Sequence, residues 1–421
     1  MFSINFKTSI SGLKRKIYIF YFSIFVFSIF RSIFYGVSSL FYIESIGLEE
    51  SNIFYIKMFN PLTIILLEIP TGLIGDRISR KLTFMISSIF CIISFLMYYV
   101  SSNLVHCIVA EIVYSIGFAF YTGSLDAIII SEIKKSKQHD LIGQTISSSL
   151  SLRVIGTMIG GAMGIVIYRY GGNHQWLVGA IGLLAITIFV SLFLEESYYS
   201  NEDILKNRKI DKDKILEPST IKKVGEKPFY TLIFDNINKN IVILIFLSGI
   251  VSFINAPFFN YWALLIKKLG VATESNLYII IYSLYMLFMA IGSKLSFEFN
   301  RYIGKKRNLS LSTYLVLITS GLMAIAGTLH MAILFFFISE FARGVRDSVF
   351  YDAYNEEVEN SKRSLMLSLL SLTQKLAAIL SLIITKTLKS NGVSVEFWIA
   401  IIGFSSILPI YLSIKKLDVK N

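Results

Sequence analysis

The sequence predicts an all-α membrane protein with twelve transmembrane helices in two six-helix bundles. Of its 421 residues, 54% are hydrophobic and only 16% are charged, whereas a soluble domain carries about 25% charged residues. The mean hydropathy is +0.64. Apolar segments recur along the whole chain, and one long polar stretch divides them into two sets of six. This pattern excludes a soluble protein and a single membrane anchor on a soluble domain.

The first half of the chain holds six apolar segments. A bilayer core needs about 20 apolar residues per helix. The first segment follows Lys14, Arg15 and Lys16 and is too long for the core of a signal peptide, so we expect a retained first span. The predicted spans of this half are 17–42, 53–75, 82–101, 104–130, 143–168 and 176–194.

A polar stretch, residues 195–239, holds nearly balanced charges and two of the six prolines. We interpret it as a cytoplasmic linker whose last part, 222–238, has the composition of a helix on the membrane surface. It separates an N-terminal bundle (1–194) from a C-terminal bundle (240–421). The predicted spans of the second half are 240–264, 275–298, 308–328, 331–351, 364–385 and 395–414.

The distribution of Lys and Arg predicts the orientation in the membrane. With the N-terminus inside, 28 of the 40 basic residues fall in cytoplasmic segments, 5 in outer loops and 7 within spans. We therefore expect a multi-pass protein of the cell membrane with both termini in the cytoplasm. The net charge of +12 follows from this topology pattern, and no nucleic-acid partner is expected.

A dense charge cluster lies between the second and third predicted spans. The stretch from Gly72 reads GLIGDRISRK. The preference of basic loops for the cytoplasm explains its basic residues but not its acid or its glycines. The stretch resembles the G-x-x-x-D-R-x-G-R-[RK] signature of the major facilitator superfamily, with Ser79 in place of a Gly. The residues that match the signature are Gly72, Asp76, Arg77, Arg80 and Lys81.

Together with twelve spans and the six-plus-six division, this resemblance covers the whole chain and implies the major facilitator fold. It implies that the cluster is a cytoplasmic latch, which holds the two bundles together when the transporter faces outward. It also implies that Arg80 pairs with an acid at the inner end of span 4, where Asp126 lies. The alternative is that the cluster is only a topology signal and Asp126 an ordinary interfacial acid.

Two further segments resemble elements of the same superfamily. Between spans 8 and 9, Gly304-Lys305-Lys306 is similar to the end of the signature, as expected of a fold built from repeats. In span 5, the stretch from Gly156 to Gly161 resembles the G-P-x-x-G-G element of proton-driven exporters, with Thr157 in place of Pro. The alternative for these glycines is ordinary close helix packing.

Charged residues within spans are costly and usually functional. The resemblance implies a central cavity lined by spans 1, 4, 7 and 10, which places several of these charges on the substrate path. Glu111 is the first candidate for the proton-coupling acid and Glu340 the second, with Arg31 and Arg153 as cations available to Glu111. The candidate residues of the substrate or proton path are Arg31, Glu111, Tyr114, Arg153, Asn255, Asn260, Trp262, Glu340 and Arg343.

Structural explanations compete with these roles. Glu340 and Arg343 are three residues apart and face the same side of a helix, so they are able to pair with each other. Tyr261 and Trp262 lie where an interface belt of aromatic residues is expected. Tyr114 is compatible with the cavity or with a neighbouring helix. These alternatives stay open at the level of the sequence.

Nothing in the sequence indicates an enzyme, a cofactor or a metal site. The four histidines are scattered, and no nucleophile elbow or phosphate-binding P-loop occurs. Cys91 and Cys107 both lie in apolar segments, where a buried small side chain is the simplest interpretation.

The sequence thus predicts a secondary transporter that works by alternating access. We expect a monomer in the lipid bilayer that moves a small-molecule substrate with protons as the coupling ion. Proton-coupled export of a drug or metabolite is the first hypothesis, uptake of a nutrient the second and lipid translocation the third. Bases outnumber acids among the charges in the middle of the membrane, which favours anionic or zwitterionic substrates.

Overall fold

The structure, a computed structural model, describes residues 3–77, 79–121, 124–136, 138, 141–194, 238–272, 275–358 and 363–417. The side chains of residues 3–11, 68–77 and 363–365 lie outside this description. Within the described ranges every regular element is a helix, as the apolar composition predicts. Apart from its last two residues, the predicted linker 195–239 lies outside the described residues.

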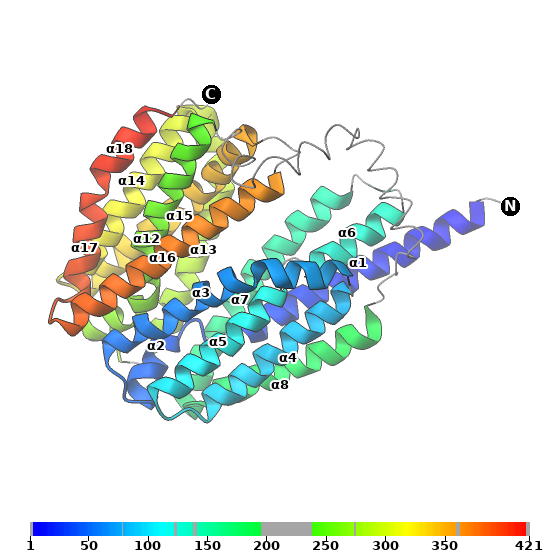
Figure 1. Ribbon diagram of the computed structural model, residues 1–421, viewed down its shortest axis with the longest axis horizontal. Helices are drawn as coiled ribbons and strands as arrows, with labels where there is room; N and C mark the ends of the chain where they lie inside the picture. Colours follow the sequence, from blue (N-terminus) through cyan, green and yellow to red (C-terminus); the bar gives the residue numbers. More distant parts are fainter. Residues whose placement is uncertain are drawn as a thin grey trace, which may run out of the picture.

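The first half of the chain forms a bundle of long helices, coloured blue to green in Figure 1. The first predicted span, 17–42, is wrong as a continuous helix, because turns replace the helix between Arg31 and Ser38. The helices are α1 (Ser3–Arg31), α2 (Ser38–Leu40), the π-helix η1 (Phe41–Ser45), α3 (Glu50–Arg77), α4 (Arg80–Tyr99), α5 (Leu104–Tyr121), α6 (Ser124–Lys135), α7 (Leu141–Gly171) and α8 (His174–Phe193).

The second half forms the other bundle, coloured green to red in Figure 1. Its last predicted span, 395–414, contains two helices that meet at Ser406. The helices are α12 (Lys239–Lys268), α13 (Asn276–Ile303), α14 (Lys305–Ala324), α15 (Leu329–Glu357), α16 (Arg363–Ser390), α17 (Val395–Ser405) and α18 (Ile407–Lys415).

In the described part of the chain, 8 helical segments are long and apolar enough to cross a membrane. The other four predicted spans fall on α1 to η1, α3, α14 and α15. These helices include in-membrane charges such as Lys57 in α3 and Glu340 in α15. The chain is therefore a multi-pass helical membrane protein, and the count of twelve spans stays a prediction.

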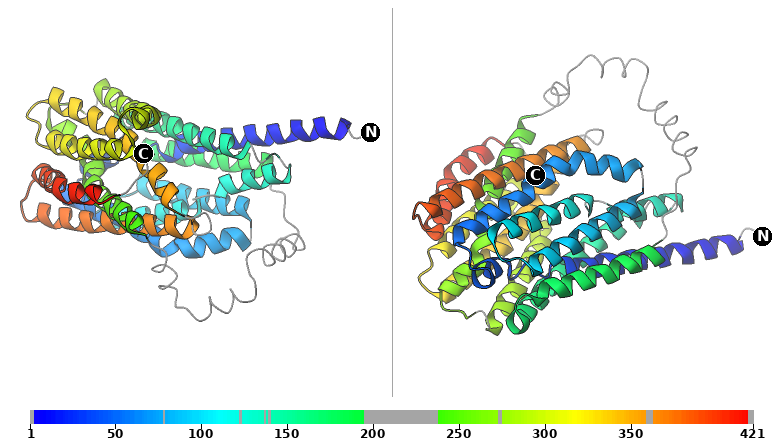
Figure 2. Two further views of the ribbon diagram at one scale, coloured as in Figure 1. Left: turned by 90° about the horizontal axis from the view of Figure 1, so that it is seen from above. Right: turned by 60° about the horizontal axis from the view of Figure 1, so that its bottom comes forward.

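Packing between helices follows the division of the chain. In the first half, α1 packs on α7 and α8, and α5 packs on α3 and α4. In the second half, α15 packs on α13 and α14, and α12 packs on α16. The two halves lie side by side (Figure 2) and meet where α3 packs on α16 and α7 on α13.

The glycines of α7 allow an unusually close approach to α1. A Cβ added to Gly160 would lie 2.1 Å from the carbonyl oxygen of Ile29, and one added to Gly164 would lie 1.6 Å from that of Ile33. Both distances are too short for any residue larger than glycine. The structure therefore gives the glycine-rich stretch of span 5 a packing role, which is the alternative that the sequence left open.

Candidate functional site

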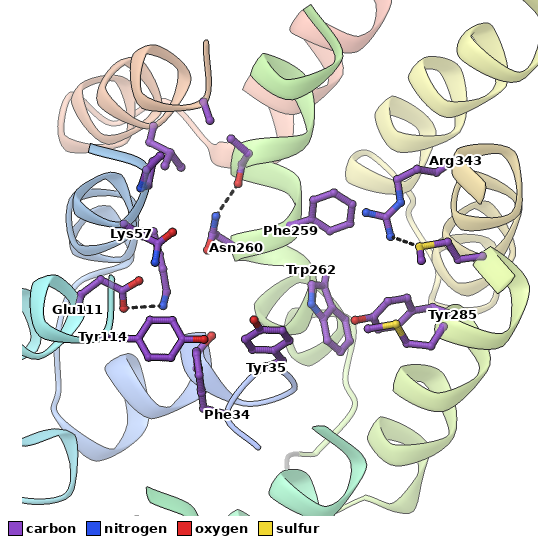
Figure 3. Close-up of a pocket in the computed structure, with 18 residues that line it drawn as sticks. Phe34, Tyr35, Lys57, Glu111, Tyr114, Phe259, Asn260, Trp262, Tyr285 and Arg343 are labelled. Atoms are coloured by element: carbon purple, nitrogen blue, oxygen red, sulfur yellow. Dashed lines mark hydrogen bonds and ion pairs between the residues drawn. The ribbon is translucent and has the colours of Figure 1, made fainter. Parts of the chain in front are cut away.

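A cavity of about 580 Å³ lies between the two halves, within the size range of small-molecule sites. Figure 3 shows Lys57, Glu111 and Tyr114 on one side and Tyr285 and Arg343 on the other. Its walls come from the segment after α1, from α3 and α5, and from α12, α13, α15 and α16. The lining residues are Phe34, Tyr35, Ser38, Lys57, Asn60, Pro61, Glu111, Tyr114, Ala256, Phe259, Asn260, Trp262, Tyr285, Met286, Met289, Arg343, Ala378 and Leu382.

The break after α1 forms part of this wall, because Phe34, Tyr35 and Ser38 line the cavity. The backbone there is bonded locally, with the amide of Tyr35 donating to the Ser32 carbonyl at 2.9 Å. Non-helical backbone at membrane depth is tolerated where it is buried in protein or lines a cavity. In transporters, interrupted helices of this kind accompany substrate sites.

Glu111 lies at the centre of a buried polar network beside the cavity. Its side chain accepts a hydrogen bond from Lys57 at 3.0 Å and one from the Tyr98 hydroxyl at 2.5 Å, and the residue is only 2% exposed. The Tyr42 hydroxyl lies 3.0 Å from that of Tyr98. The expectation that an arginine pairs with Glu111 is wrong, because the cation is Lys57. Lys57 is on α3, a helix next to α5, which carries Glu111.

Arg31 lies at the last residue of α1, beneath two tyrosines of the cavity wall. Its Nη1 donates to the hydroxyl of Tyr35 at 2.7 Å and to that of Tyr114 at 3.0 Å. Its guanidinium carbon lies 5.2 Å from the ring centre of Phe118 and 5.7 Å from that of Tyr121. Its Nε is buried without a partner. In the described chain, none of its bonds reaches a carboxylate.

Arg343 carries the charge on the opposite wall. It forms an ion pair with Glu340, as the spacing of three residues on one helix allows. Its guanidinium also lies 4.0 Å from the ring centre of Phe259 and donates to the Met289 sulfur at 3.2 Å. Glu340 is 1% exposed. Among the described side chains, Arg343 is the cation that pairs with it.

The candidates in α12 divide into lining and non-lining residues. Asn260 and Trp262 line the cavity, whereas Asn255 does not. The Asn260 amide donates to the Ala256 carbonyl of its own helix at 2.7 Å. Trp262 is 5% exposed and stacks on Phe336 with ring centres 5.5 Å apart. Trp262 is thus buried against the cavity and a neighbouring ring, and its membership of an interface belt stays a prediction.

Ion pairs join the two halves at one end of the molecule, which we call the sealed end and define by Glu44, Glu50, Lys267, Lys268 and Lys389. Glu50 pairs with Lys268 at 3.0 Å and with Lys389 at 2.8 Å, and Glu44 pairs with Lys267. Burial acts to raise the pKa of Glu50, but hydrogen bonds from Lys389 and Lys268 outweigh it and lower this pKa. Sequence reasoning missed these pairs, because their members are far apart along the chain.

Comparison with known proteins places this architecture in a family. A family model described as Major Facilitator Superfamily matches residues 20–382. The chain belongs to the major facilitator superfamily. No curated protein sequence matches it significantly.

Solved structures of several transporters share the fold. The nucleoside transporter NupG has a TM-score of 0.73 at 14% identity, over 96% of this chain and 100% of that one. A peptide transporter, POT, solved in complex with sulfate, has a TM-score of 0.68 at 14% identity, over 96% of each chain. A D-xylose-proton symporter has a TM-score of 0.68 at 14% identity, over 96% of this chain and 99% of that one. These identities support the fold alone.

The superfamily signature begins at Gly72, and its Asp76 and Arg77 side chains lie outside the described part. Ser79, which replaces the family's glycine, caps α4, with its side chain accepting from the Leu82 amide at 3.1 Å. A serine at this position satisfies an amide at the start of the helix. Lys81 donates to the Ser191 carbonyl of α8 at 2.7 Å.

Asp126 does not pair with Arg80 as the superfamily resemblance implied. Its partner is Arg153 of α7, at 2.6 Å, and none of the bonds of Asp126 within the described chain reaches Arg80. Arg153 also lies 5.5 Å from the ring centre of Tyr121. The predicted place of Arg153 on the cavity wall is not found: its charge is matched by Asp126, and it is not among the lining residues.

The partial second copy of the signature lies between α13 and α14 and forms ion pairs within its own half. Gly304 adopts φ +81, a conformation that favours glycine. Lys305, which follows it, pairs with Asp352 at 2.8 Å and with Glu356 at 2.5 Å, both in α15. Although burial opposes its charge, these two acids raise the pKa of Lys305. The basic residue after the glycine, at the start of α14, thus binds two acids near the end of the next helix, α15.

Proposed function

We propose that this protein is a secondary active transporter that moves a small organic compound by alternating access, coupled to protons and directed outward. Its membership in the superfamily supports the transport mechanism. The observation that carries the proposal is the cavity between the two halves, which is lined by ionisable groups from both of them. A site of this kind is exposed to one side or the other when the halves rock.

The sealed end supports alternation between two states. Its ion pairs connect Glu50 of α3 to Lys268 of α12 and Lys389 of α16, so they must break before the halves separate there. Partly exposed ion pairs contribute about 0–1 kcal/mol each. A closure built from them is therefore reversible, as exchange between two states of similar free energy requires.

Glu111 is the group that we propose takes up the coupling proton. It lines the cavity, and its carboxylate pairs with Lys57 at 3.0 Å. A proton on Glu111 would remove this attraction and leave Lys57 free to bond elsewhere, so that protonation changes the contacts of α3 with α5. Glu340 remains the second candidate, because its pairing with Arg343 brings it close to the same cavity.

We further propose that the protein lies in the cell membrane as a monomer, with two six-helix bundles, a cytoplasmic linker at 195–239 and both termini in the cytoplasm. The distribution of Lys and Arg supports this orientation. The sealed end then faces outward, and the structure corresponds to an inward-facing state. A cysteine placed at Ser200 should resist a membrane-impermeant maleimide added to intact cells, and ready labelling would reverse the orientation.

Export rests on the resemblance of the stretch Gly156–Gly161 to the exporter element. Uptake is the second candidate, favoured by the likeness of the fold to that of a D-xylose-proton symporter. Proton flux into proteoliposomes with a trapped pH-sensitive dye tests the common mechanism, using a nucleoside, a dipeptide, a sugar and an aromatic carboxylate as probes. We expect one class of probe to drive proton movement that Glu111→Gln abolishes. Proton movement that is identical in the variant would overturn the role of Glu111.

The direction of transport needs a separate measurement. Cells that express the protein should accumulate less of the active probe than cells without it, and dissipating the proton gradient should remove the difference. Higher accumulation in expressing cells would favour uptake.

A further inference from the structure

We propose that the substrate of the central cavity is an organic anion, whose carboxylate binds Arg31 while its apolar body lies among the aromatic rings of the wall. This inference rests on the proposed function and adds the substrate class to it. Three independent features carry it: the charge balance of the cavity, the bonds of Arg31 and the break in the first span.

The charge balance of the cavity leaves one cation unmatched. We consider the described side chains that line the cavity or bond to its lining residues. Lys57 is matched by Glu111 at 3.0 Å, and Arg343 is matched by Glu340. Arg31 has no acid. The net charge of this set is therefore positive, and an unmatched charge within a membrane is costly. An anionic substrate would compensate it.

The bonds of Arg31 argue against a purely structural role. The residue ends α1, where a cation is favoured by the helix dipole and where free backbone carbonyls are available. An arginine that served only the helix end would donate to those carbonyls. Arg31 instead donates to the hydroxyls of Tyr35 and Tyr114, both of which line the cavity. Its charge is thus directed toward the cavity.

The two tyrosines extend the site. A phenol that accepts a bond from a guanidinium still has its own proton to donate. A carboxylate at the cavity wall would therefore receive bonds from a tyrosine hydroxyl and from Arg31, as charge-assisted recognition requires. The buried and unpartnered Nε of Arg31 shows that the guanidinium is not saturated by the protein.

The break after α1 lies in the cavity wall. Turns from Ser32 to Val37 replace the helix, and Phe34, Tyr35 and Ser38 line the cavity, so the segment that carries Tyr35 directly follows Arg31. Phe34 with Phe259, Trp262 and Tyr285 supplies most of the aromatic wall. Figure 3 shows Tyr35 between Tyr114 and Trp262. The apolar body of the substrate fits this wall.

The experiment is a binding titration of the purified protein in detergent, followed by tryptophan fluorescence, because Trp262 lines the cavity. The probes are 3-phenylpropanoate, its neutral amide and the corresponding amine, which share one apolar body. Arg31→Gln removes the charge, and Arg31→Lys keeps it without the paired donors. Arg346→Gln is the matched control, because Arg346 is a buried arginine of α15 that pairs with Asp347 and lies outside the cavity wall.

We expect the carboxylate to bind the wild-type protein and the amide and amine to bind at least about 10-fold more weakly. Arg31→Gln should weaken carboxylate binding by roughly 10- to 100-fold, Arg31→Lys should weaken it less, and Arg346→Gln should leave it unchanged. The melting temperature of each variant without probe shows whether it is folded. If Arg31→Gln does not fold, the relative affinities of the wild-type protein for the three probes test the proposal, which requires the carboxylate to bind most tightly.

Three results would overturn the proposal: no saturable binding of the carboxylate, equal or tighter binding of the amine, or unchanged binding by folded Arg31→Gln. Binding in detergent needs no gradient. Arg31-dependent binding without gradient-driven transport in proteoliposomes would therefore contradict the proposed function and leave the anion site standing. Gradient-driven transport of a cation would support the proposed function and contradict the anion site.

Discussion

The sealed end offers the sharpest test of how this protein changes state. Glu50→Gln replaces a carboxylate by an amide of the same shape at the centre of the ion pairs between the halves. Glu50 contacts Lys268 at 3.0 Å, Lys389 at 2.8 Å and the Tyr261 hydroxyl at 3.1 Å. The substitution leaves the hydrogen-bond geometry possible but removes the attraction of two lysines across the interface.

The magnitude follows from the exposure of the partners. The side chain of Lys268 is 42% exposed and that of Lys389 is 28% exposed, so water screens both pairs and each is worth about 0.5–1 kcal/mol. Their joint loss should shift the equilibrium between the closed and open forms of this end by about 1–2 kcal/mol, which is about 5- to 30-fold in population. Global stability should change little, because both bundles keep their own cores.

Glu396→Gln is a matched control. Glu396 pairs with Lys268 at 2.9 Å and accepts from Tyr261 at 2.6 Å, but all three residues belong to the C-terminal half. The control removes a similar carboxylate without loosening the contact between halves. Distances between spin labels at Glu49 and Asn391, which are exposed on opposite halves, report the opening.

We expect a longer distance population to appear in Glu50→Gln and not in Glu396→Gln. Identical distance distributions in Glu50→Gln and the wild type would refute the assigned role of the sealed end. The pH dependence adds a second check. Because its pKa is lowered in the folded protein, Glu50 contributes fully above the ordinary glutamate pKa of about 4.3 and loses its contribution as the pH falls through the lower folded value. The closed population should therefore be constant between neutral and mildly acidic pH.

The remaining predictions concern the proton site, the helix packing and the latch. Glu111→Gln should abolish gradient-driven transport and preserve exchange without a gradient; a lower melting temperature with unchanged pH dependence of transport would instead assign Glu111 a structural role. Gly164→Ala should lower the free energy of unfolding by at least the roughly 1–3 kcal/mol typical of overpacking, because its Cβ would lie 1.6 Å from the Ile33 carbonyl oxygen. A clearly lower melting temperature should report this loss. Gly143→Ala, with open space around the added Cβ, should be neutral, and equal effects would contradict the packing argument. Asp76→Asn should preserve expression and impair transport, and normal transport would reduce the charge cluster to a topology signal.

Local features of the sequence are enough to predict the class of the protein. The length and number of the apolar segments, the placement of basic residues and the signature from Gly72 to Lys81 are local properties, and each predicts the fold without any contact being known. The pair Glu340 and Arg343 was also foreseeable, because residues three apart on one helix are neighbours. Tyr114 and Trp262 were among the predicted residues of the substrate path, and both line the cavity.

Which charges meet depends on how the helices pack, which the sequence does not specify. Lys57 and Glu111 belong to different helices, and an error of a few residues in the depth of a span is enough to exchange Lys57 for an arginine as the expected partner. The break after Arg31 was also hidden, since the segment from Ser32 to Val37 is apolar enough to be taken for a helix. Side-chain partners across helices depend on rotation, depth and local breaks, which apolar periodicity does not specify. In the described structure Glu111 and Glu340 have cationic partners, whereas Arg31 bonds to two tyrosines of the cavity wall and to no described acid.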